Sequence, residues 1–137
     1  MEYATLREKI AAEKTARVEK YAGFSALWDR ARSAGRSAGE GGRPQPMAIA
    51  DGFTGELIDI VPDGLCGFAW VTIRPGGSSF ARWLAANGYA RKAYGGGMQI
   101  WIGDYGQSME RKYAHACAMA DTFRAAGIDA SAGSRMD

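Results

Sequence analysis

Residues 66–88 read CGFAWVTIRPGGSSFARWLAANG, and this stretch decides the fold. Its first nine residues, which end at Arg74, are predicted to be a strand because most of them are apolar, aromatic or β-branched, and the Pro-Gly-Gly that follows stops that strand. One of the two serines then caps a short helix over residues 80–87, and Gly88 closes the helix as a left-handed terminator. The stretch therefore predicts one strand followed by one helix.

The same alternation continues toward the C-terminus. Residues 89–94 and 98–102 are predicted to be strands, and the three glycines between them predict a hairpin turn. Ser108 is placed to cap a long helix over residues 109–126, and residues 128–132 form the last predicted strand. The predicted order is strand, helix, strand, strand, helix, strand.

That order predicts an α+β fold, a ferredoxin-like βαββαβ sandwich in which two right-handed crossovers place both helices on one face of a four-stranded antiparallel sheet. Residues 65–137 are long enough to form it. Another α+β sandwich with the same elements in a different strand order is the alternative.

A long N-terminal helix over residues 1–37 is expected to precede this domain. Leu6, Ile10, Val18 and Tyr21 recur at helical steps, although a lysine interrupts the stripe. This pattern predicts a packing element or a dimerising arm. A membrane-surface helix is disfavoured because the acids of this block nearly balance its bases.

Residues 38–64 are expected to be a Gly/Pro-rich acidic connector. From residue 44 to residue 64 there are four acids and no base, and the acids lack the spacing of a calcium loop. Residues 47–50 and 57–61 are the short apolar runs in it and are predicted to be strands. The acids are expected to be solvated.

Composition limits the class of protein. A chain of 137 residues with a net charge of +2 is expected to be one domain with no strong overall nucleic-acid footprint. Nineteen glycines are about twice the usual share, and most of them fall at predicted turns and helix ends. No apolar run approaches the length of a membrane span, so no membrane partner is expected.

The two predicted faces of the sheet differ in chemistry. Period-two alternation places Ala69, Val71 and Ile73 on one face, and Phe68, Trp70 and Arg74 on the other. Trp101 of the hairpin joins the aromatic side. This face is predicted either to be covered by the N-terminal helix or to contact a ligand or partner, because aromatic rings beside basic residues stack nucleobases. The structural cover is favoured, because large apolar patches are seldom left bare.

Further binding candidates are basic or aromatic residues of the C-terminal domain. The glycine-rich turn is predicted to be a hairpin turn and not a phosphate loop, because it lacks the required spacing. With the aromatic face, the full set of candidates is Phe68, Trp70, Arg74, Arg91, Lys92, Tyr94, Trp101, Arg111 and Arg135.

No catalytic or metal site is predicted, and no cofactor is expected. His115 and Cys117 are two residues apart on a helix and would point in different directions. Cys66 is distant in sequence and forms no metal-binding pair with Cys117. Both thiols are expected to be free in a reducing cytoplasm.

Several segments together resemble a widespread group of small accessory proteins encoded by tailed bacteriophages and prophages. They are GFAWVTIRP from residue 67, SFARWLAANGYARK from residue 79, IWI from residue 100, QSMERK from residue 107 and the terminal GSRMD, with the Ser-Ala-Gly spacer and PQPM before them. The resemblance implies a protein that acts in the cytoplasm of an infected bacterium. It assigns no functional residue.

The favoured hypothesis is a non-enzymatic binding protein that inhibits a bacterial defence system, of the anti-CRISPR or signal-nucleotide-sponge type. Its expected partner is a host protein complex or a nucleotide ligand, and the protein is expected to be a homodimer. The alternative is a single-stranded nucleic-acid-binding module that uses the aromatic sheet face. A small hydrolase or transferase built around His115 is the third hypothesis.

Overall fold

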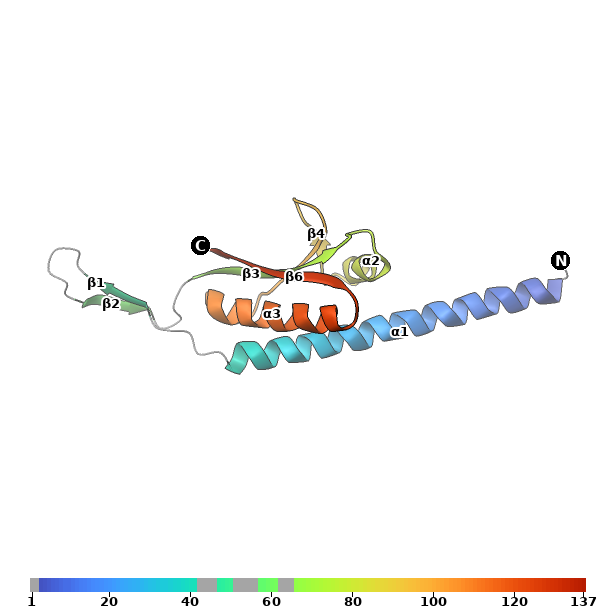
Figure 1. The fold of residues 1–137 in the computed structure, drawn as a ribbon, viewed down its shortest axis with the longest axis horizontal. Helices are drawn as coiled ribbons and strands as arrows, with labels where there is room; N and C mark the ends of the chain where they lie inside the picture. Colours follow the sequence, from blue (N-terminus) through green and yellow to red (C-terminus); the bar gives the residue numbers. More distant parts are fainter. Residues whose placement is uncertain (1–2, 42–46, 51–56, 62–65) are drawn as a thin grey trace.

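The computed structural model describes residues 3–41, 47–50, 57–61 and 66–137 (Figure 1). It is an α+β structure with a long N-terminal helix and a four-stranded antiparallel sheet, as predicted. The elements are α1 (Tyr3–Gly41), β1 (Met47–Ala50), β2 (Leu57–Val61), β3 (Gly67–Arg74), α2 (Ser79–Ala86), β4 (Arg91–Lys92), β5 (Met98–Trp101), α3 (Met109–Ala125) and β6 (Asp129–Met136).

The main sheet has the strand order β4-β5-β3-β6, and each neighbouring pair is antiparallel. The long strand β3 is central and pairs with β6 along its whole length. β1 and β2 form a separate antiparallel pair, which confirms the two strands expected within the connector. The predicted connector acids Asp51, Glu56 and Asp63 lie outside the described residues.

The core lies between the sheet and the helices α2 and α3. Ala69, Val71 and Ile73 are fully buried, which confirms the inward face predicted from period-two alternation. Leu84 of α2 and Phe123 of α3 are also fully buried in this cluster. Burying a side chain of this size stabilises the fold by about 1.5–3 kcal/mol.

Serine caps and glycine terminators define the two shorter helices. The Ser78 hydroxyl accepts a hydrogen bond from the backbone of Ala81, and Ser108 does the same for Arg111. Gly88 and Gly127 follow the two helices with φ of 76° and 84°, a conformation that favours glycine. The two N-cap serines and the two helix-terminating glycines therefore lie where the sequence predicted them.

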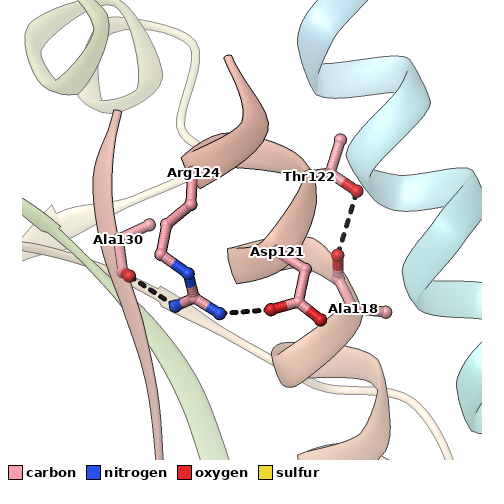
Figure 2. A network of polar contacts seen from close by, with 5 residues as sticks. All are labelled: Ala118, Asp121, Thr122, Arg124 and Ala130. Atoms are coloured by element: carbon pink, nitrogen blue, oxygen red, sulfur yellow. Dashed lines mark hydrogen bonds and ion pairs between the residues drawn. The ribbon is translucent and has the colours of Figure 1, made fainter. Parts of the chain in front are cut away.

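The C-terminal turn of α3 is tied to β6 by one arginine (Figure 2). The Arg124 guanidinium donates to the backbone oxygen of Ala130 at 2.7 Å and forms an ion pair with Asp121. On the same turn, the Thr122 hydroxyl donates to the backbone oxygen of Ala118 at 2.9 Å. Of these contacts, the one from Arg124 to Ala130 joins the end of the helix to β6.

The first strand of the hairpin and the last strand of the sheet differ from their predicted lengths. The strand expected over residues 89–94 shortens to Arg91–Lys92, because the Tyr89 N–H bonds to the backbone oxygen of Leu84 at the end of α2. That donor is therefore not available to the sheet. The last strand, predicted over residues 128–132, continues to Met136 because β3 offers a partner for each residue.

The N-terminal helix runs past its predicted end at residue 37 and stops at Gly41. Two glycines near this end allow the helix backbone to lie directly on α3 and on the loop before it. A Cβ at Gly35 would lie 2.5 Å from the His115 ring, and one at Gly39 would meet the Tyr105 phenol. Close packing on α3 therefore outweighs the low helix propensity of glycine.

The face that α1 covers differs from the prediction. The N-terminal helix was expected to dock on the aromatic face of the sheet, but its second half packs on α3, on the opposite side (Figure 1). Leu27, Trp28 and Ala31 are buried there, and Trp28 stacks on Tyr89 at 4.5 Å. The glycines at 35 and 39 and the stack of Trp28 on Tyr89 let α1 pack closely on this side.

The first half of α1 extends beyond the folded body (Figure 1). Residues 5–23 are all exposed, and those before Arg17, which span about 18 Å at 1.5 Å per residue, project past α2. Its stripe of Leu6, Ile10, Val18 and Tyr21 is exposed by 42–62%. We refer to residues 5–23 as the arm.

Candidate functional site

Three aromatic rings meet on the outer face of the sheet. Trp70 of β3 lies directly opposite Trp101 of β5, and their ring centroids are 5.1 Å apart. Phe68 contacts Trp101 edge-on with centroids 6.1 Å apart. We call Phe68, Trp70 and Trp101 the aromatic face. Strand alternation predicted that these rings share a face, and the structure confirms it.

The aromatic face is open. Trp101 is 36% exposed, and Phe68 and Trp70 are half-buried. Both α1 and α3 lie on the other side (Figure 1). No element in the described part of the chain packs over the three rings. Exposed aromatic patches of this kind typically mark a binding surface.

A glycine on β6 sets the position of the Trp70 indole. Gly133 pairs with Trp70 across the strands, and a Cβ at Gly133 would lie 2.6 Å from Trp70 Nε1. The indole therefore lies over the bare backbone of β6. Sequence reasoning did not assign Gly133 this role, although its place opposite an aromatic residue in a strand is a usable signal.

Three cations border the aromatic face. Arg91 lies over the Trp101 ring at 5.6 Å from its centroid, and Arg135 lies over Phe68 at 5.5 Å. The ammonium of Lys112 approaches Phe68 to 5.6 Å and donates to the backbone oxygen of Gly67. Arg91 and Arg135 are exposed, so their charges are also available to a ligand. Lys112, buried on α3, was not among the predicted candidates.

The other predicted candidates lie elsewhere. Arg74 shares the outer face by strand alternation, but it is about 13 Å along β3 from Trp70. Lys92 pairs with buried Met98 and so belongs to the opposite side of the sheet. Tyr94 is fully exposed in the hairpin turn. Arg111 lies on the first turn of α3, where its charge acts on Tyr105.

A hollow continues the aromatic face at the edge of the sheet. It has a volume of about 220 Å³ and lies where β4 is too short to cover Trp101. Tyr89, Arg91, Gln99 and Trp101 contribute to its walls. A planar group at this edge would meet two exposed rings, one cation and one amide.

His115 occupies a different environment, beneath α1. A hydrogen bond of 2.8 Å joins its Nδ1 to the Tyr105 hydroxyl. Burial lowers the pKa of His115 below 6.5, with Arg36 and Arg32 acting in the same direction against the Asp104 carboxylate. Burial, followed by the charges of Asp104 and Glu40, raises the pKa of Tyr105.

The Tyr105–His115 pair serves the packing of α1. Gly35 lies so close to the imidazole that a Cβ there would be 2.6 Å from Nε2, and Nδ1 is already bonded. Tyr105 adopts a φ of 71°, a strained value for a residue with a side chain. Sequence reasoning missed this partner because Tyr105 lies in a loop ten residues away.

Within the described residues there is no group of three or more His, Cys, Asp or Glu side chains placed to hold a metal. Cys66 and Cys117 are both free thiols. No described helix combines the length and apolarity needed to cross a membrane. No protein-family model, curated protein or solved structure matches the chain.

Proposed function

We propose that the protein is a non-enzymatic binding module that stacks the bases of single-stranded nucleic acid on its aromatic face. The observation that carries this proposal is the open cluster of Phe68, Trp70 and Trp101 with arginines at its border. Single strands offer unstacked bases to such rings, whereas a duplex hides them.

The rings and the cations have complementary roles in this proposal. Stacking of one base on one aromatic side chain stabilises a complex by about 1–3 kcal/mol and tolerates any base. Arg91 and Arg135 attract the phosphate backbone, so the affinity falls as salt rises. The rings already contact one another before a ligand binds, which reduces the ordering cost of association.

We infer that the sheet belongs to the ferredoxin-like arrangement. The order of elements from β3 to β6 and the strand order β4-β5-β3-β6 support this inference. RNA-recognition modules stack bases on the open face of such a four-stranded sheet. Here the strand 98–101 carries one aromatic residue where that class has several, which favours stacking over sequence-specific reading.

Inhibition of a bacterial defence system is the second candidate function. It follows from the resemblance to phage accessory proteins, and the exposed apolar stripe of the arm favours it because such a stripe fits a protein partner. In this proposal the protein acts in the cytoplasm of the infected cell. Equal plating of phage with and without the gene, across defence-positive strains, would eliminate it.

Titration of intrinsic tryptophan fluorescence with a single-stranded oligothymidylate at low salt tests the first proposal. We expect quenching, because a stacked base contacts Trp101, and we expect added salt to reverse it. A duplex of the same length should quench less. Absence of quenching by the single strand at low salt would refute base stacking on this face.

A further inference from the structure

A second hollow, separate from the aromatic face, lies between α1 and α2. Its volume is about 700 Å³, within the range of about 300–1,000 Å³ typical of small-molecule sites. We call it the interhelix groove. The residues that line it are Arg17, Lys20, Tyr21, Ser79, Arg82, Trp83, Ala86 and Asn87.

The charge of the interhelix groove is entirely positive. Arg17 and Lys20 come from α1 and Arg82 from α2, and no Asp or Glu is part of the lining. The sequence around α2 has the same bias, because residues 67–103 contain no acid. Several cations gathered around one groove attract an anion more strongly than each would singly.

One of the three cations is held in place. The Lys20 ammonium donates to the Ser79 hydroxyl at 2.9 Å, which joins the wall from α1 to the wall from α2. Ser79 is also the first residue of α2, so the positive end of this helix dipole lies on the same wall. Both features favour an anion beside Lys20.

The groove also has an ordered aromatic wall. The Trp83 indole is stacked on Phe80, with centroids 6.0 Å apart and planes at 13°, and its edge contacts Tyr89. Tyr21 on the arm faces the same groove and is 47% exposed. Trp83 is only half-buried, so these contacts fix its ring without covering it completely.

We propose that the interhelix groove binds a nucleotide, with its phosphate on Lys20, Arg17 and Arg82 and its base against Trp83 or Tyr21. A site with only cations would suit any anion, and a site with only rings would suit any planar apolar group. The two together fit a ligand that carries a phosphate and a flat ring in one small molecule. An acidic peptide is the competing ligand.

This site shares no lining residue with the aromatic face, so its proposal stands or falls independently of the proposed function. Calorimetric titration of the full chain at low salt with AMP, adenosine and inorganic phosphate tests it. We expect AMP to bind roughly tenfold or more tightly than either fragment, since only AMP uses both walls. Tyr113→Ala removes an exposed ring from α3, outside both proposed sites, and should leave AMP binding unchanged.

Paired charge variants locate the binding. Lys20→Gln with Arg82→Gln should weaken AMP binding roughly tenfold or more, because two charge-assisted contacts are lost. Lys9→Gln with Arg30→Gln removes the same charge from exposed positions of α1 outside the groove and is the matched control. All four side chains are exposed, and circular dichroism verifies that both variants fold.

Three results would overturn the proposal. One is no measurable AMP binding by the unaltered chain at low salt. Another is equal weakening by the control pair, which would mean that only net charge matters. The third is tighter binding of an oligoglutamate peptide than of AMP, which would assign the groove to an acidic protein partner.

Discussion

The hydroxyl of Tyr105 lies 2.8 Å from Nδ1 of His115, and two glycines of α1 lie directly on this pair. The contact links a strained loop before α3, the middle of α3 and the end of α1. It fixes α1 on the helical side of the sheet, and it thereby leaves the aromatic face open.

Replacement of either glycine that covers this pair by alanine is expected to destabilise the fold. Gly39→Ala introduces a methyl group against the Tyr105 phenol, and Gly35→Ala introduces one against the His115 ring. Overpacking of this kind costs about 1–3 kcal/mol, more than the gain in helix propensity of about 1 kcal/mol. Each variant should therefore lower the free energy of unfolding measured by urea titration.

Gly23→Ala is the matched control for these two substitutions. Gly23 belongs to the same helix, but a Cβ there would meet nothing within 4 Å. Its replacement should raise helix content and should not lower stability, because alanine favours the helix by about 1 kcal/mol. If all three substitutions had the same effect, the proposed role of glycine in close packing would be wrong.

Docking of α1 is expected to weaken in acid. Burial lowers the pKa of His115, aided by Arg36 and Arg32 and opposed by Asp104. The unfolded chain therefore binds a proton at His115 more readily than the folded chain does. This contribution to stability is complete above about pH 6.5 and is lost as pH falls toward the lower folded-state pKa. Thermal melts across this range measure it.

His115→Gln isolates this group from the carboxylates that also titrate in acid. The variant should be less stable at neutral pH, because the fit beneath Gly35 and Gly39 is altered. Its melting temperature should change less between neutral pH and mild acid than that of the unaltered chain. An identical pH dependence in both proteins would show that another group is responsible.

The protein is expected to form a homodimer through the apolar stripe of the arm. Leu6→Glu with Ile10→Glu places charges on that stripe without touching the folded body, since both residues are exposed. Light scattering should give a dimer mass for the unaltered chain and a monomer mass for the variant. A monomer mass for the unaltered chain would contradict the prediction.

Gly133, whose bare backbone lies opposite Trp70, is expected to be needed for full affinity toward single-stranded nucleic acid. A Gly133→Val side chain would displace the Trp70 indole, because even a Cβ would lie 2.6 Å from Nε1. The variant should bind an oligothymidylate more weakly and show altered tryptophan emission. Ser131→Val, at an exposed position on the same strand, is the control that should change neither.

Local signals predicted much of this fold. Serine caps, glycine terminators and strand alternation act between neighbours in sequence, so they predicted α2, α3 and the two faces of the sheet. The course of α1 depends on tertiary contacts. The glycines at 35 and 39 are typical helix breakers, and only the surface formed by α3 and the loop before it explains why the helix continues through them.

The two candidate sites likewise combine features that local sequence signals predict with features that depend on tertiary contacts. Strand alternation correctly predicted that Phe68, Trp70 and Trp101 share one face of the sheet, because the alternation of side chains along a strand is a local property. It did not indicate whether a distant helix would cover them. The interhelix groove combines Lys20 and Arg82, which are far apart in sequence, and no spacing rule could predict that they meet.

Removal of the exposed ring of the aromatic face tests the central claim most directly. Trp101→Ala should weaken binding of a single-stranded oligothymidylate at low salt by about 5- to 150-fold, the equivalent of about 1–3 kcal/mol for one stacked base. Tyr113→Ala removes an exposed ring from α3 and should leave the affinity unchanged. Equal affinities for the unaltered chain and Trp101→Ala would contradict nucleic-acid binding on this face.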